Sequence, residues 1–110
     1  MTAKLVLSAE MQTHAETCNA WWRQNRPAAP ALFADELEAA LVRMSELPDS
    51  GKPMPRKNRP SLRRVEMTKT RYYVLYEHDA ATNTVYVHAV WSALRGRGPR
   101  LRTSRWRPAA

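Results

Sequence analysis

The chain has 110 residues, 44% of them hydrophobic and 25% charged, which fits one small globular domain. No run approaches 18 apolar residues, so we expect no membrane span, and residues 1–8 lack the charged and apolar regions of a secretory signal. Cys18 is the only cysteine, which excludes an internal disulfide. A cytoplasmic protein with no membrane partner is therefore expected.

The net charge of +8 is divided unevenly along the chain. Residues 1–50 contain four Lys or Arg and seven Asp or Glu, a net −3, whereas residues 51–110 contain fourteen and three, a net +11. The last seventeen residues hold six arginines and no acidic residue. This polarity predicts an acidic partner for the C-terminal half, either nucleic acid or an acidic protein segment.

The N-terminal half predicts a short strand followed by two helices. Residues 3–7 form the strand, and Ser8 is placed to cap a helix that carries Glu10 in its first turn. An apolar residue recurs at helical spacing in Met11, Ala15, Cys18 and Trp22. We expect this helix to end near Arg26, because Pro27 disfavours helical geometry in the residue before it.

The second helix is expected to begin with Pro30 at its first position and to end at Pro48. Its apolar stripe consists of Phe33, Leu37, Ala40, Leu41, Met44 and Leu47. The link between the helices is then about three residues long, so the two helices should form an antiparallel hairpin.

The C-terminal half predicts a loop, three strands and a tail. Residues 48–61 contain four prolines and four basic residues, which indicates an irregular, exposed, basic loop. Strands are expected at residues 62–68, 71–78 and 84–91, with a turn at 79–83. Residues 94–110 have no apolar periodicity, so we divide the chain into a domain of residues 1–93 and an arginine-rich tail of residues 94–110.

The resulting order, β-α-α-β-β-β, predicts an α+β fold with the helical hairpin packed on one face of a small, mainly antiparallel sheet. If side chains alternate strictly between the two faces of the sheet, both faces are apolar. A sheet with helices on one face only would need just one apolar face. We therefore expect the tail or a partner to cover a second face that carries Tyr72, Val74, Tyr76, Tyr86 and Val90.

Several spaced segments together resemble one known superfamily. They are residues 20–30 (AWWRQNRPAAP), Phe33 with Glu36 and Leu37, Leu47-Pro48 with Gly51, and residues 70–76 (TRYYVLY), 87–91 (VHAVW) and 95–101 (RGRGPRL). Over residues 4–101 this ordered set resembles the RelE/ParE superfamily of toxins from type II toxin–antitoxin systems. The resemblance implies the fold given above and a cognate antitoxin whose C-terminal segment wraps the toxin.

The superfamily contains branches that cut messenger RNA in the ribosome and a ParE branch that poisons DNA gyrase. One nuclease branch carries a glutamate in the loop where this chain has Met54, and an arginine where it has Tyr73. In these nucleases the end of the last strand often supplies an ionisable group, whereas this chain has Ser92 at that place. These departures favour the ParE-like branch, a binding toxin without an enzymatic reaction of its own.

Three function classes follow. The first is a ParE-like toxin that binds a target such as gyrase and is neutralised by an antitoxin with an acidic C-terminal segment. The second is a ribosome-dependent endoribonuclease, whose catalytic set would be Arg64, Glu66, Arg71 and His88. The third is a small basic nucleic-acid-binding module.

Target or antitoxin binding is assigned to tyrosine and arginine side chains of the basic half. They are Arg63, Arg64, Tyr72, Tyr76, Tyr86, Arg95, Arg97 and Arg100. His14 and Cys18 lie one helical turn apart, but two ligands are too few for a structural zinc site, so we expect no metal and no cofactor. A homodimer and a toxin–antitoxin hetero-oligomer both remain open.

Overall fold

The computed structural model describes residues 2–94, and its elements follow the expected order with one short strand added. In chain order they are strand β1 (Lys4–Leu7), helices α1 (Ala9–Asn25) and α2 (Leu32–Glu46), and strands β2 (Lys52–Pro53), β3 (Arg63–Met67), β4 (Tyr72–Asp79) and β5 (Thr84–Ser92). The addition is β2, which pairs with β3 inside the loop that was expected to be irregular.

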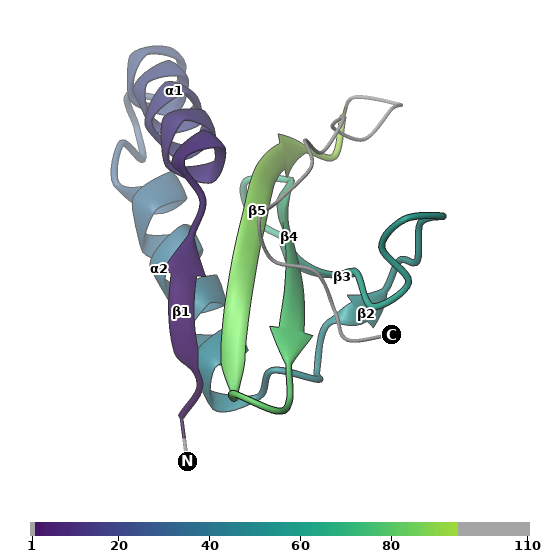
Figure 1. The fold of residues 1–110 in the computed structure, drawn as a ribbon. Coiled ribbons are helices and arrows are strands. Elements are labelled where there is room, and N and C mark those ends of the chain that lie inside the picture. The colour runs from purple at the N-terminus through teal and green to yellow at the C-terminus, as the bar shows by residue number, and fades with distance from the viewer. Residues whose placement is uncertain (1, 95–110) are drawn as a thin grey trace.

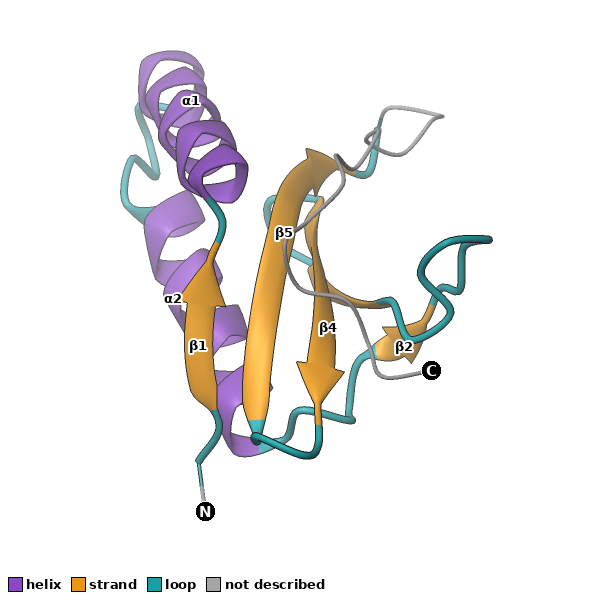
Figure 2. Ribbon diagram, viewed as in Figure 1, coloured by secondary structure: helices purple, strands orange, loops and turns teal. Residues whose placement is uncertain are grey.

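The five strands form one sheet in the order β1-β5-β4-β3-β2. β1 runs parallel to β5, and the other neighbours are antiparallel. Both helices lie against the same face of this sheet (Figures 1 and 2). The predicted α+β class, with a helical hairpin on one face of a mainly antiparallel sheet, is confirmed.

Helix α1 has the boundaries that its end signals predict. The Ser8 hydroxyl accepts a hydrogen bond from the Met11 amide at 3.0 Å, which satisfies one of the free amides at the helix start. At the other end the Arg26 amide donates to the Trp22 carbonyl, and Pro27 follows. The sequence-based boundaries of this helix are therefore confirmed.

Helix α2 begins two residues later than expected, so the prediction that Pro30 occupies its first position is wrong. The cap residue is Ala31, and residues 26–31 form a six-residue connection rather than one of about three. The Trp22 indole donates to the Ala29 carbonyl at 2.8 Å, and the Leu32 amide donates to the same carbonyl at 3.2 Å. These two bonds stabilise the connection as turns.

A β-bulge in β5 determines which side chains reach the helices. The β4–β5 register shifts between Leu75 and Tyr76, whose partners are Ala89 and Val87, so His88 is an extra residue on β5. Val85 and Val87 pack toward the helices before the bulge, and Val90 does so after it. The strict alternation assumed from sequence is therefore wrong at this point of the strand.

The expected set of residues on the second sheet face is wrong for two reasons. The bulge changes the side of Val90, and the helices cover the face of β4 that was expected to lie away from them. Tyr72, Val74, Tyr76 and Val90 all belong to the core between the sheet and the helices, with Phe33 and Met44. Of the expected set, only Tyr86 lies outside this core. Sequence alternation separated the two faces of β4 correctly but could not say which face the helices cover.

Two side-chain clamps connect the helical layer to the sheet and its loops. The Glu36 carboxylate accepts hydrogen bonds from the Lys69 and Thr70 amides and from the Thr70 hydroxyl at 2.6–2.9 Å. The buried Tyr76 hydroxyl donates to the Pro48 carbonyl at 2.8 Å and accepts from the Gly51 amide at 2.9 Å. The second clamp holds the start of the β2 loop against the sheet.

Within residues 2–94, no helix is long and apolar enough to cross a membrane.

Candidate interaction site on the helix-free sheet face

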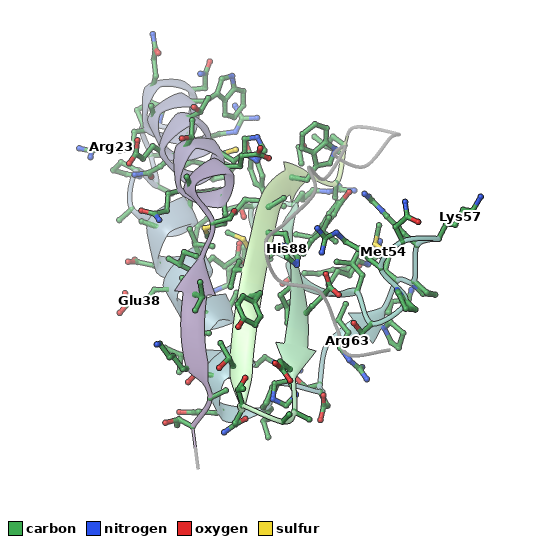
Figure 3. The ribbon with its side chains drawn as sticks, in the orientation of Figure 1. Arg23, Glu38, Met54, Lys57, Arg63 and His88 are labelled. Carbon is green, nitrogen blue, oxygen red and sulfur yellow. The ribbon has the colours of Figure 1, made fainter. Side chains whose placement is uncertain are left out.

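The sheet face opposite the helices, here called the helix-free face, has its own apolar cluster. Leu62 precedes β3, Tyr73 and Leu75 lie on β4, and Ala89 lies on β5 beside the partly buried Trp91. Met54, from the loop after β2, packs against the same cluster. The basic loop of residues 52–62 therefore docks on this face (Figure 3).

A buried ionic network lies beside this cluster. Glu77 of β4 is fully buried, and one carboxylate oxygen accepts from the Arg59 guanidinium at 2.6 Å and from His88 Nε2 at 2.8 Å. Its other oxygen accepts from the Ser61 hydroxyl at 2.8 Å. Because alternation from Val87 places His88 on the side of Glu77, β5 and the loop of residues 52–62 both supply donors to one carboxylate.

The network keeps Glu77 ionised. Burial alone would raise the pKa of Glu77, but the hydrogen bonds from its three donors outweigh burial and hold the pKa below its ordinary value. Charge-assisted hydrogen bonds to a buried carboxylate are stronger than neutral ones. The network therefore holds the basic loop against the sheet, since Arg59 and Ser61 both belong to that loop.

A second pair of side chains lies on the same face. The Arg64 guanidinium lies 5.7 Å from the centre of the Tyr73 ring and forms an ion pair with Glu66 at 3.1 Å. Burial raises the pKa of the Tyr73 hydroxyl, although the charges of Arg56 and Arg64 act against it. Arg64 is thus held over a tyrosine ring at the start of β3.

The residues named for a ribonuclease site lie on three different elements, and three of them have partners of their own. Arg64 and Glu66 pair with each other on β3, while Arg71 is an exposed residue of the β3–β4 turn with a φ of 65°. His88 is only 7% exposed and bonds to Glu77, not to Glu66. Glu66 and His88 do not lie on adjacent strands, because β4 lies between β3 and β5.

The predicted binding residues occupy different environments. Tyr76 is fully buried and Tyr72 packs edge-on against Phe33, so both rings contribute to the core. Tyr86 of β5 is partly exposed and lies directly opposite Glu77 of β4. Arg63 donates to the Asp49 and Gly51 carbonyls and so holds the loop before β2. The three predicted arginines of the tail lie outside the described residues.

Sequence reasoning missed the residues at the centre of the network, Glu77, Arg59 and Ser61. One signal was present: Glu77 is the only acidic residue in a run of aromatic and aliphatic residues from 72 to 77. A charge in such a strand requires a buried partner. Its partners could not be found, because Arg59 and Ser61 lie in a proline-rich loop without periodicity. Within residues 2–94, no three His, Cys, Asp or Glu side chains form a metal-binding group.

Comparison with known proteins agrees with this fold. One solved structure, the toxin–antitoxin complex RelBE2 from Mycobacterium tuberculosis, superposes with a TM-score of 0.59 at 19% identity, over 84% of this chain and 99% of that chain. An arginine-to-alanine double mutant of the E. coli toxin RelE in the free state gives 0.55 at 18% identity, over 86% of both chains. At these identities the likeness establishes the fold alone.

The sequence itself matches one family profile over nearly all of the described residues. No curated protein matches the chain. The matching profile is that of the ParE toxin of the type II toxin–antitoxin system parDE, and the match covers residues 5–96. The resemblance inferred from spaced motifs is confirmed, and the chain belongs to the ParE toxin family of type II toxin–antitoxin systems.

Proposed function

We propose that this ParE-family chain stops bacterial growth by binding a protein target, DNA gyrase, without cleaving RNA, and that a cognate antitoxin neutralises it. The observation that carries the proposal is the environment of His88, the histidine of the candidate ribonuclease set. Its Nε2 is bonded to the buried Glu77 carboxylate, and its side chain is almost fully buried.

Ribonuclease chemistry needs a base for the 2′-hydroxyl, an acid for the leaving oxygen and a cation for the phosphate, all within reach of one substrate. His88 is held in a structural network, Arg64 and Glu66 pair with each other, and Arg71 is an exposed residue of the β3–β4 turn. The loop position at which a nuclease branch has a glutamate is Met54, which packs against the apolar cluster and has no ionisable group. These facts favour a binding toxin over a nuclease.

The charge distribution supports an acidic antitoxin segment as the second partner. The loop of residues 52–62 carries four basic residues and lies on the helix-free face beside Arg64. Lys52 and Lys57 of this loop are exposed, and carboxylates of an extended acidic segment could pair with them. Tyr86 and the tail residues Arg95, Arg97 and Arg100 belong to the same proposal. A toxin–antitoxin hetero-oligomer in the cytoplasm is the expected assembly.

Two assays on the purified chain test the proposal. With DNA gyrase, the protein should inhibit supercoiling and accumulate gyrase-linked DNA breaks. With translating ribosomes, it should leave messenger RNA intact. In cells, induced expression should stop growth, and co-expression of a small neighbouring gene should restore it. Codon-specific cuts that disappear in Arg64→Ala or Glu66→Gln would instead establish the nuclease function.

A further inference from the structure

The turn between β3 and β4 holds an arginine in a backbone conformation that side chains rarely adopt. Arg71 has a φ of 65°, in the left-handed region where glycine and asparagine are the usual residues. A larger residue is strained there, because its Cβ comes too close to the following carbonyl oxygen. Residues kept in such a conformation must be held by their surroundings, and they cluster at functional sites.

Main-chain hydrogen bonds on both sides hold Arg71 in this conformation. Its amide donates to the Met67 carbonyl at 2.8 Å, and its carbonyl accepts from the Ala93 amide at 2.8 Å. The Glu36 carboxylate fixes the rest of the turn by accepting from two of its amides. The backbone of the turn is therefore tied to β3, to α2 and to the end of β5.

The side chain of Arg71 is not part of these ties. It is exposed, and within residues 2–94 its guanidinium has no hydrogen-bond or ion-pair partner. The other cation of the turn, Lys69, is also exposed, but its charge acts on the nearby Glu36 carboxylate. The turn thus presents to solvent a guanidinium whose backbone is fixed and whose charge is available to a partner.

The surroundings of Arg71 along the chain are positively charged. The turn lies at the end of the sheet where β5 finishes (Figure 1), and Ala93 is the last residue before the arginine-rich tail. Residues 67–72 contain two cations and no acidic residue, and residues 93–110 contain six arginines and no acidic residue. So many cations with no acid between them suit a partner that is itself a polyanion.

We propose that Arg71 binds a backbone phosphate of duplex DNA. A guanidinium contacts phosphate oxygens bidentately, and duplex DNA carries one negative charge per about 1.7 Å of its axis, so successive cations of one chain can each meet a phosphate. An acidic protein segment carries its carboxylates on flexible side chains without this regular spacing, and the acidic segment of an antitoxin is already assigned to the helix-free face. The inference rests on the proposed function only in choosing DNA, on which gyrase acts, as the polyanion.

Three substitutions of Arg71 separate its charge from its backbone strain. Arg71→Gln removes the charge and keeps the strain, Arg71→Lys keeps both, and Arg71→Gly removes both. Binding of the full chain to a short labelled DNA duplex is measured by fluorescence anisotropy over a series of salt concentrations. In about 0.1 M salt the glutamine and glycine variants should bind roughly eightfold more weakly, and the slope of log affinity against log salt should become shallower by about 0.9, because one phosphate contact is lost. The lysine variant should keep the slope.

Thermal melts of the same variants show whether Arg71 is merely structural. Arg71→Gly should melt about 4 °C higher than the wild type, because glycine adopts this φ without strain. Arg71→Gln and Arg71→Lys should melt close to the wild type. A residue that only stabilised the turn would lose stability together with DNA binding, so a lower melting temperature of Arg71→Gly would overturn the inference.

Arg43→Gln is the matched control for charge. Arg43 is exposed in the last turn of α2, about two helical turns from the Glu36 clamp, so its loss should leave the salt slope unchanged. An unchanged slope in Arg71→Gln, or an equal loss in Arg43→Gln, would overturn the inference. If a glutamate-rich peptide binds as tightly as the duplex and loses the same affinity in Arg71→Gln, Arg71 serves a protein partner and the inference is wrong.

Gyrase assays distinguish this inference from the proposed function. If the chain binds DNA through Arg71 but leaves gyrase supercoiling unaffected, the proposed function fails and the DNA contact stands. If the chain inhibits gyrase but Arg71→Gln binds the duplex as tightly as the wild type, the proposed function stands and the DNA contact is refuted.

Discussion

Replacing Glu77 with leucine tests whether the buried network stabilises the fold. The leucine side chain would fill much the same space but accept no hydrogen bond. Arg59, 11% exposed, and His88, 7% exposed, would lose their carboxylate partner, and the Ser61 hydroxyl would lose its acceptor. Breaking a buried ion pair by removing one partner costs about 3–5 kcal/mol, because the remaining charge stays buried without compensation.

The free energy of unfolding should therefore fall by about 3–5 kcal/mol in Glu77→Leu, a large part of the roughly 5–15 kcal/mol that stabilises a typical domain. Urea denaturation at pH 7, followed by circular dichroism, measures this loss as a shift of the midpoint. Because the cost arises from unpaired charges and not from lost packing, a triple variant with Glu77→Leu, Arg59→Met and His88→Leu should recover most of the stability.

The control for volume is Leu75→Ala on the same strand and face. Leu75 is also fully buried, and its truncation removes only apolar contacts, at a cost of about 2–5 kcal/mol. That loss should not be recovered by replacing Arg59 and His88. If Glu77→Leu is as stable as the wild type, or if the triple variant is no better than the single one, the ionic account of this network is wrong.

Three further predictions concern the clamps and the tail. Burial raises the pKa of Glu36, but its hydrogen bonds outweigh burial and lower the pKa below its ordinary value. The stabilising contribution of Glu36 is therefore complete above the unfolded carboxyl pKa of about 4.3 and is lost as pH falls through the folded pKa. Glu36→Gln should flatten the acid side of a stability–pH curve measured with urea. Tyr76→Phe removes the bonds to a buried amide and a carbonyl and should cost about 1–3 kcal/mol in the same denaturation assay. Deleting residues 102–110 should change the free energy of unfolding by less than about 0.5 kcal/mol. Replacing the three arginines of residues 95–100 with alanine should weaken antitoxin or target binding in a salt-dependent way. A large loss of melting temperature in that triple variant would refute the binding assignment.

The helical half of the fold was largely predictable because its signals are local. Ser8 caps a helix whose end is set by Pro27, and the structure follows both. The start of α2 was not predictable from Pro30 alone, since it depends on the Trp22 indole binding a carbonyl seven residues away. A proline favours the first turn of a helix, but a tertiary hydrogen bond decided where the turns ended and the helix began.

The strands were found from sequence, but which face of the sheet meets the helices was not. Both faces of β4 are apolar, so alternation offers no way to choose between Tyr72–Val74–Tyr76 and Tyr73–Leu75. The choice depends on what covers each face: α1 and α2 cover the first, while Leu62 and Met54 of the loop pack on the second. A loop read as exposed and irregular thus supplied part of a second small core.

The bulge at His88 explains why the side of the sheet that Val90 faces was misread. One extra residue in β5 moves Val90 to the helix side and leaves both His88 and Ala89 on the other side. Without the bulge, alternation from Val85 and Val87 would still leave His88 on the helix-free side, but Val90 would lie there too and Ala89 would face the helices. The bulge therefore decides the sides of Ala89 and Val90, whereas His88 shares the side of Glu77 by simple alternation from Val87. Glu77 in an apolar strand is the sequence signal that hydrogen-bond donors lie nearby, since a buried carboxylate requires them, and His88 of β5, Arg59 and Ser61 are those donors.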